Sequence, residues 1–155
     1  MILNSHKTAI ARKSQPVPTR WLLSQNLIRF PVLDYGCGKC QQVNPDPWIN
    51  YDPYWYKIDL DYFRGSFQTV VCNYVICTLP ESEEKKILRE IQSLLSDNTE
   101  AVAFITVRND TPKAGHGVSS KGTFQRKVIL PYLVELRVTS QYRIYLLTKK
   151  DIVGY

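Results

Sequence analysis

The chain has 155 residues, of which 44% are hydrophobic and 22% are charged. These proportions are those of an average globular domain, and they exclude a disordered chain and a fibrous one. The longest apolar stretch, around Val70–Cys77, is far shorter than the roughly 20 residues that a membrane-spanning helix requires. We therefore expect residues 1–155 to form a single domain that does not enter the membrane.

Charge is distributed unevenly along the chain, which carries a formal net charge of +6. Residues 1–31 carry five cations and no acid, residues 32–107 carry six cations and eleven acids, and residues 108–155 carry nine cations and three acids. If both basic flanks lie on one side of the fold, they form a positive surface that suits nucleic acid. Solvated basic faces without a partner are the alternative.

The first 18 residues form a basic N-terminal arm that contains Lys7, Arg12 and Lys13. This arm has no sustained apolar run of the kind that a secretory signal needs, so we expect a cytoplasmic protein. No feature of the sequence indicates how many copies associate.

The first half of the chain alternates apolar segments with breaks. Residues 18–28 have the pattern of a short helix with Thr19 as its cap, and this helix leads into a buried strand over residues 30–34. A second strand is expected over residues 49–52, after a proline-containing link so short that any helix in it has one or two turns. Residues 53–66 are aromatic and acidic without a clear period, so their structure stays open.

The second half begins with a strand over residues 67–76 and an amphipathic helix over residues 81–95. A buried strand over residues 101–107 follows, and then a polar loop over residues 108–131 that is long enough to carry function. An antiparallel hairpin is indicated by two alternating segments, residues 132–138 and 142–148. This order predicts an α/β fold with a mainly parallel sheet and an antiparallel C-terminal hairpin.

The four cysteines are spaced as two pairs, Cys37 with Cys40 and Cys72 with Cys77. This spacing raises two alternatives, a four-thiolate zinc site and a redox pair at the first two cysteines. Cys72 lies inside an apolar segment, however, where a thiol acts as a small hydrophobic side chain. We therefore expect no metal site, and no disulfide in the cytoplasm.

The strongest chemical signal is the sequence Asp34-Tyr-Gly-Cys-Gly38 at the end of the first predicted strand. Glycines in such a turn let a ligand approach the backbone where a side chain would block it. Asp52 follows Gly38 by 14 residues and ends the second predicted strand. An acid at that point accepts hydrogen bonds from the ribose hydroxyls of a nucleoside-like ligand. A tight turn without a ligand is the alternative for the glycines alone.

This stretch resembles motif I of the S-adenosylmethionine-dependent methyltransferases with a Rossmann-like fold, and Asp52 resembles the acid that ends their second strand. The resemblance implies that the turn Gly36, Cys37 and Gly38 passes beneath the methionine part of S-adenosylmethionine. It also implies that Asp34 positions the amino group of this cofactor and that Asp52 holds its ribose. The single Asp-x-Gly-x-Gly turn, in place of Gly-x-Gly-x-x-Gly opening a full helix, favours this cofactor over a dinucleotide.

The segment Val70–Ile76 resembles the fourth strand of that family, whose carboxyl end faces the transferred methyl group. Asn73 and Tyr74 are therefore the candidate catalytic residues, with the Asn73 amide accepting from an amino group and the Tyr74 ring stacking on a base. Asn73 is also a candidate cofactor contact. The sequence here departs from the Asn/Asp-Pro-Pro-Tyr/Phe pattern of adenine-amino methyltransferases. Strand-end hydrogen bonding of Asn73 and core packing of Tyr74 are the alternatives.

The loop over residues 108–131 supplies the candidate substrate-binding residues. Arg108, His116 and Lys121 are expected to line the acceptor site, with an inert surface histidine as the alternative for His116. Phe124 and Gln125 come from a narrower resemblance to the methyltransferases associated with DNA phosphorothioation. This resemblance also includes Thr8–Ser14, Tyr51–Pro53 and Cys72–Val75, but this chain is shorter and has Cys40 in place of an expected third glycine.

An aromatic cluster next to Asp52 either flanks the adenine ring of the cofactor or packs in the core or at its rim; it comprises Tyr51, Tyr54, Trp55 and Tyr56. The glycine turn and Asp52 favour a methyltransferase, and the basic flanks favour DNA, RNA or a nucleotide as its acceptor. A small-molecule methyltransferase and a non-catalytic protein that binds S-adenosylmethionine are the alternatives.

Overall fold

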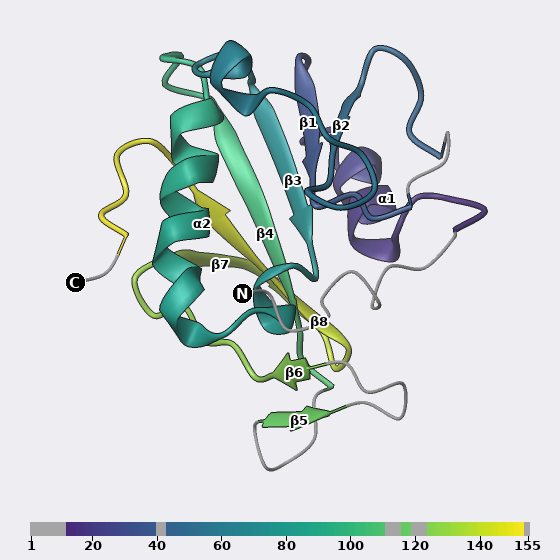
Figure 1. Ribbon diagram of the computed structural model, residues 1–155, viewed down its shortest axis with the longest axis vertical. Helices are drawn as coiled ribbons and strands as arrows, with labels where there is room; N and C mark the ends of the chain where they lie inside the picture. Colours follow the sequence, from purple (N-terminus) through teal and green to yellow (C-terminus); the bar gives the residue numbers. More distant parts are fainter. Residues whose placement is uncertain (1–11, 40–42, 111–115, 119–123, 154–155) are drawn as a thin grey trace.

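The computed structural model describes residues 12–39, 43–110, 116–118 and 124–153, and a six-stranded sheet forms its centre (Figure 1). The strands lie in the order β2-β1-β3-β4-β8-β7. Their bounds are β1 Val32–Tyr35, β2 Ile49–Tyr51, β3 Thr69–Asn73, β4 Val102–Arg108, β7 Val134–Val138 and β8 Tyr142–Leu147. Strands β1 to β4 are parallel, and β8 is antiparallel to both β4 and β7. The predicted α/β class with an antiparallel C-terminal hairpin is confirmed.

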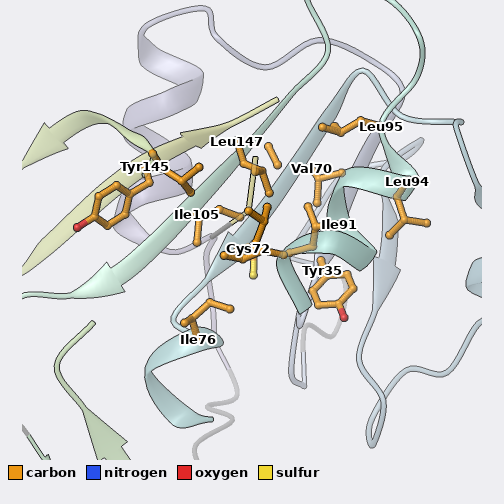
Figure 2. Close-up of a cluster of buried hydrophobic side chains, with 14 of the residues drawn as sticks. Tyr35, Val70, Cys72, Ile76, Ile91, Leu94, Leu95, Ile105, Tyr145 and Leu147 are labelled. Atoms are coloured by element: carbon orange, nitrogen blue, oxygen red, sulfur yellow. The ribbon is translucent and has the colours of Figure 1, made fainter. Parts of the chain in front are cut away.

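Helices α2 (Glu81–Leu94) and α1 (Val17–Ser24) cover opposite faces of the sheet. Successive strand residues point to opposite faces, so Val70 packs with Leu88 and Ile91 of α2, whereas Val71 packs with Leu22 of α1. Figure 2 shows part of the larger cluster, in which Ile91 lies among strand side chains. The apolar stripe of α2, spaced by three and four residues, explains both its helical form and its buried face.

Two elements end earlier than the sequence predicts, because a residue near each end takes a left-handed backbone conformation. α1 ends at Ser24, and Asn26 two residues later has φ of 57°. Thr19 lies inside this helix and is not its cap, since the cap position is Pro16. β3 ends at Asn73, and Tyr74 with φ of 61° turns the chain into the 3-10 helix η3 (Ile76–Thr78). A positive φ at a bulky residue is uncommon and has no signal in the sequence.

Two connections agree with the expectation or settle what the sequence left open, and a third differs from it. The described residues between β1 and β2 contain no helix. The aromatic segment after β2 contains the 3-10 helix η2 (Leu60–Phe63). The polar loop predicted over residues 108–131 contains a two-stranded sheet of β5 (His116–Val118) and β6 (Phe124–Arg126), whose three-residue strands are too short to give a periodic signal. Among the described residues, no helix is long and apolar enough to cross a membrane.

Candidate functional site

The carboxyl ends of β1, β2 and β3 bring the predicted site residues to one edge of the sheet. β1 pairs with β2 on one side and with β3 on the other, so the order of the strands reverses at β1. Ligands of open parallel sheets bind outside the carboxyl ends of the strands at such a switch point. The glycine turn follows β1, Asp52 follows β2, and Asn73 is the last residue of β3.

The Asp52 carboxylate joins the glycine turn to the end of β2. Its Oδ2 accepts from Gly38 N–H at 2.9 Å, and its Oδ1 accepts from the N–H groups of Tyr54 and Trp55 at 2.8 and 2.9 Å. The two motifs singled out in the sequence are therefore in direct contact. A carboxylate offers about four acceptor positions, so about one remains for a ligand hydroxyl.

The other backbone N–H groups of the glycine turn are also bound within the protein. Gly36 and Cys37 both donate to the carbonyl oxygen of Tyr51, at 2.7 and 2.9 Å. Loops that hold phosphate need such N–H groups free to point at the anion. The turn therefore has no anion cradle at these residues, which disfavours a pyrophosphate ligand there.

Gly36 is required at its position by a packing contact that the sequence does not reveal. Its φ is +78°, and a Cβ built on it would lie 2.2 Å from Val75 Cγ2. Val75 belongs to the segment that follows β3. This glycine therefore allows the connection after β3 to approach the turn after β1, and Val75 fills the space that a side chain would occupy.

Asp34 is a buried carboxylate in β1. It is 6% exposed, and Oδ2 accepts from Asn44 Nδ2 at 2.7 Å. Asn44 Nδ2 also donates to Asn50 Oδ1 at 2.7 Å, and Asn44 Oδ1 accepts from Gln15 Nε2 at 2.9 Å. Burial raises the pKa of Asp34 to about 6, although the Asn44 hydrogen bond and the Arg12 charge act in the opposite direction. A carboxyl that is costly to ionise at a switch point is typical of functional sites.

The side-chain amide of Asn73 is held through its nitrogen by Thr19, the residue that the sequence predicted as a helix cap. Asn73 Nδ2 donates to Thr19 Oγ1 of α1 at 2.8 Å. Asn73 Oδ1 is buried and accepts no hydrogen bond from the described residues, and the same holds for Oγ1 of its β4 register partner Thr106. Register partners in parallel strands share a face, so two unsatisfied oxygens lie on the α1 face at the carboxyl edge.

Tyr74 is a half-buried residue that lies between the two core clusters. Its N–H donates to the carbonyl oxygen of Thr106 at 2.9 Å, which helps to hold its left-handed backbone. Burial raises the pKa of its hydroxyl to about 12, so this group stays protonated at neutral pH. The side chain therefore offers a ring and a hydrogen-bond donor, not a general base.

The residues expected to line the acceptor site fall in different places. Arg108 ends β4 and pairs with Asp110 at 2.9 Å. His116 lies on β5, which is within the described backbone, whereas its side chain and all of Lys121 lie outside the described residues. Phe124 and Gln125 are half-buried on β6, and Gln125 Oε1 is a further buried oxygen that has no hydrogen-bond partner among the residues that the structure describes.

A buried ion pair that the sequence did not indicate anchors β6 to the rest of the fold. Arg126 donates to Glu84 Oε1 of α2 at 3.0 Å and to the carbonyl oxygen of Leu79 at 2.6 Å. Both side chains are less than a tenth exposed, and Tyr132 donates to the other Glu84 oxygen at 3.4 Å. This network fixes the strand that carries Phe124 and Gln125 beside the connection that follows β3.

The aromatic cluster beside Asp52 lies largely at the surface and not in the core. Tyr54, Trp55 and Tyr56 are 57%, 41% and 51% exposed. Tyr51 is half-buried and packs on Tyr35 at a centroid distance of 5.1 Å. Packing in the core therefore does not apply to these three rings, whereas packing at the rim of the core and flanking of the adenine ring both stay predictions.

Cys72 and Cys77 are fully buried in the core, where burial raises the pKa of both thiols. Cys37 is half-buried in the glycine turn, and Cys40 lies outside the described residues. No group of three or more His, Cys, Asp or Glu side chains with a metal-binding arrangement occurs in the part of the chain that the structure describes.

Carboxylates neutralise much of the positive charge on the two basic flanks. In the described residues, five flank cations form ion pairs, namely Arg29, Arg108, Arg126, Arg143 and Lys149. Arg137 instead covers the Trp21 ring at 4.4 Å. The positive surface available to a polyanion is therefore narrower than the net charge of the flanks suggests.

No family model matches the chain, and no curated protein matches it in sequence. Solved structures do resemble it in fold. A 1,6-didemethyltoxoflavin-N1-methyltransferase from Burkholderia thailandensis aligns with a TM-score of 0.55 and 12% identity over 93% of this chain and 77% of its own. An S-adenosylmethionine-dependent methyltransferase from Mesorhizobium loti aligns with a TM-score of 0.51 and 11% identity over 82% and 96%. The chain thus has the Rossmann-like fold that is found in methyltransferases.

Proposed function

We propose that the chain is an S-adenosylmethionine-dependent methyltransferase. The observation that carries this proposal is the contact between the glycine turn after β1 and the Asp52 carboxylate after β2, at the switch point of the sheet. The structure from Burkholderia thailandensis holds S-adenosylhomocysteine, the cofactor after loss of its methyl group, and so supports the same ligand here.

The donor and acceptor groups of the turn suit a nucleoside better than a nucleotide. Asp52 retains about one acceptor position for a ribose hydroxyl, and a second hydroxyl would bind on displacing Gly38 N–H. The N–H groups of Gly36 and Cys37 already donate to Tyr51 and offer nothing to a phosphate. S-adenosylmethionine carries a ribose and no phosphate, and when bound it supplies a methyl group on a sulfonium for in-line displacement.

The buried oxygens of Asp34 and Asn73 would bind the two remaining polar groups, namely the amino group of the cofactor and that of the methyl acceptor. Asp34 would attract the cationic amino group of the cofactor, which would bring the raised pKa of its carboxyl down again. Asn73 Oδ1 receives no hydrogen bond from the described part of the chain, so it would accept from an amino group of the methyl acceptor. Tyr74 would bound the acceptor space through its ring. Displacement from a sulfonium depends on positioning more than on a strong base, so none of these roles requires one.

Two classes of acceptor are supported by different observations. A small nitrogen heterocycle is supported by the neighbour from Burkholderia thailandensis, which binds 1,6-didemethyltoxoflavin. A nucleic acid or nucleotide is supported by the net charge of +6. The narrower role in DNA phosphorothioation is supported by sequence motifs alone, through Phe124 and Gln125 in the described residues.

Titration calorimetry with S-adenosylhomocysteine tests cofactor binding. We expect Asp52→Asn to weaken binding about tenfold or more, because a charge-assisted hydrogen bond is lost. Asp59→Asn is the matched control, because Asp59 is an exposed carboxylate that accepts from Asp61 N–H at the start of η2. Wild-type protein that does not bind, or an Asp52→Asn variant that binds as tightly, would contradict the proposal. Transfer of a labelled methyl group into DNA, RNA, protein and metabolite pools then identifies the acceptor.

A further inference from the structure

The residues that follow β2 form a short, closed loop that presents three aromatic rings in succession. Asp52 and Tyr56 exchange backbone hydrogen bonds at 2.9 and 3.1 Å, which closes the loop at its base. The Asp52 carboxylate accepts from Tyr54 and Trp55 N–H, which holds its tip. We call residues 54–56 the aromatic turn. Its backbone is fixed before any partner binds, so binding there would lose little conformational entropy.

The rings of the aromatic turn lie exposed although burial would favour them. Tyr54 and Trp55 pack edge to face at a centroid distance of 4.8 Å, and roughly half of each side chain faces solvent. Each large aromatic side chain gains free energy when it is covered, so three rings that are each about half exposed leave apolar area that a binding partner can cover. Neighbouring rings on a rigid backbone suit flat groups that stack.

The charges around the aromatic turn suit an anionic partner. Lys39 Nζ lies 4.8 Å from the centroid of the Trp55 ring, and the exposed Lys57 follows the turn directly. Three acids flank the turn in the sequence. Asp52 is engaged by three backbone N–H groups and Asp61 pairs with Arg64 at 3.0 Å, whereas the exposed Asp59 accepts from Asp61 N–H at 3.1 Å. A partner with flat rings and a negative backbone could therefore stack on the rings of the aromatic turn and pair with Lys39 and Lys57.

From these observations we propose that the aromatic turn binds single-stranded nucleic acid by stacking its bases. Aromatic side chains beside cations bind unpaired bases without strong sequence preference, because every base has an exposed π-face. A duplex keeps its bases stacked on one another and does not offer these faces. The turn also adjoins the switch point through Asp52, so a strand held there lies beside the proposed methyl donor. That this strand is the methyl acceptor rests on the proposed function, whereas its binding does not.

Fluorescence anisotropy with labelled 20-nucleotide oligo-dT and oligo-U, and with a duplex of equal length, tests this proposal. We expect both single strands to bind more tightly than the duplex, and Trp55→Ala to weaken their binding about tenfold or more. Trp55→Phe keeps a ring and should restore most of the affinity. Tyr62→Ala is the matched control, because Tyr62 is 80% exposed on η2 and should be dispensable. Thermal melts establish that all variants fold.

Three results would overturn the proposal: no binding of the single strands, tighter binding of the duplex, or equal affinity of Trp55→Ala and wild-type protein. A salt-dependent affinity that is unchanged in Trp55→Ala would place the strand on the basic flanks instead. Calorimetry of S-adenosylhomocysteine on the same samples separates the two proposals. Strand binding that depends on Trp55, without binding of S-adenosylhomocysteine, would contradict the proposed function alone. Binding of S-adenosylhomocysteine without strand binding that depends on Trp55 would contradict only the inference about the aromatic turn.

Discussion

Replacing Gly36 by alanine tests why a glycine stands after β1. Its φ of +78° lies in the left-handed region, where a side chain costs about 1–2 kcal/mol. The added Cβ would lie 2.2 Å from Val75 Cγ2, so Val75 must shift, and such overpacking costs about 1–3 kcal/mol. We therefore expect Gly36→Ala to lower the free energy of unfolding by about 2–5 kcal/mol.

Urea unfolding followed by circular dichroism measures this loss, and two further variants divide it. Gly65→Ala is the matched control, because Gly65 has φ of +70° and no atom of the described residues lies within 4 Å of its added Cβ. It should lose about 1–2 kcal/mol, from the backbone alone. In a Val75→Ala background, the contact between the added Cβ and Val75 Cγ2 is absent. Gly36→Ala should then lower the free energy of unfolding by little more than Gly65→Ala does in the wild-type protein. Equal losses for Gly36→Ala and Gly65→Ala in the wild-type background would refute the reasoning.

Three further substitutions test the buried polar groups. The pKa of Asp34 is raised to about 6, so the folded state holds its proton more tightly than the unfolded state, and stability falls as the pH rises from about 4 to 6. Asp34→Asn should remove this fall of up to about 3 kcal/mol, and urea unfolding with the same pH dependence as wild-type protein would contradict the assignment. Arg126→Ala leaves the buried Glu84 without its cation and should cost about 3–5 kcal/mol, part of which Glu84→Gln should restore in thermal melts. Thr19→Val removes the acceptor of the Asn73 amide and should cost about 1–3 kcal/mol, and Thr19→Ser should cost much less; equal losses would show that the hydroxyl is not responsible.

The sequence predicts those parts of the fold that leave a periodic pattern. The stripe of Leu88, Ile91 and Leu94 on α2 has the helical spacing, and the apolar segments of β3 and β4 have the composition of buried strands. The contact between Gly38 and Asp52 follows from the same principle, because carboxyl ends of neighbouring parallel strands meet at one edge. Local pattern and strand order suffice for this part of the site.

Contacts between distant residues leave no such pattern. Glu84 and Arg126 are separated by 42 residues, and in the sequence each has the character of a surface charge. Asn73 meets Thr19 across 54 residues, and the helical position of Thr19 depends on where α1 begins. The left-handed backbone of Tyr74 arises where β3 meets η3, so composition alone predicts a longer strand. These features follow from tertiary packing, which decides them against local propensity.

Asp52 connects the two proposed binding surfaces, and this affects how its substitution is interpreted. Its Oδ2 holds the glycine turn and its Oδ1 holds the aromatic turn, so Asp52→Ala would disturb both surfaces and distinguish neither. Asparagine retains one oxygen, which can keep accepting from Tyr54 and Trp55, and places an amide N–H group opposite the N–H of Gly38. Two donors then face each other at the glycine turn only. Loss of S-adenosylhomocysteine binding with retained strand binding in Asp52→Asn would therefore separate the surfaces that one carboxylate holds together.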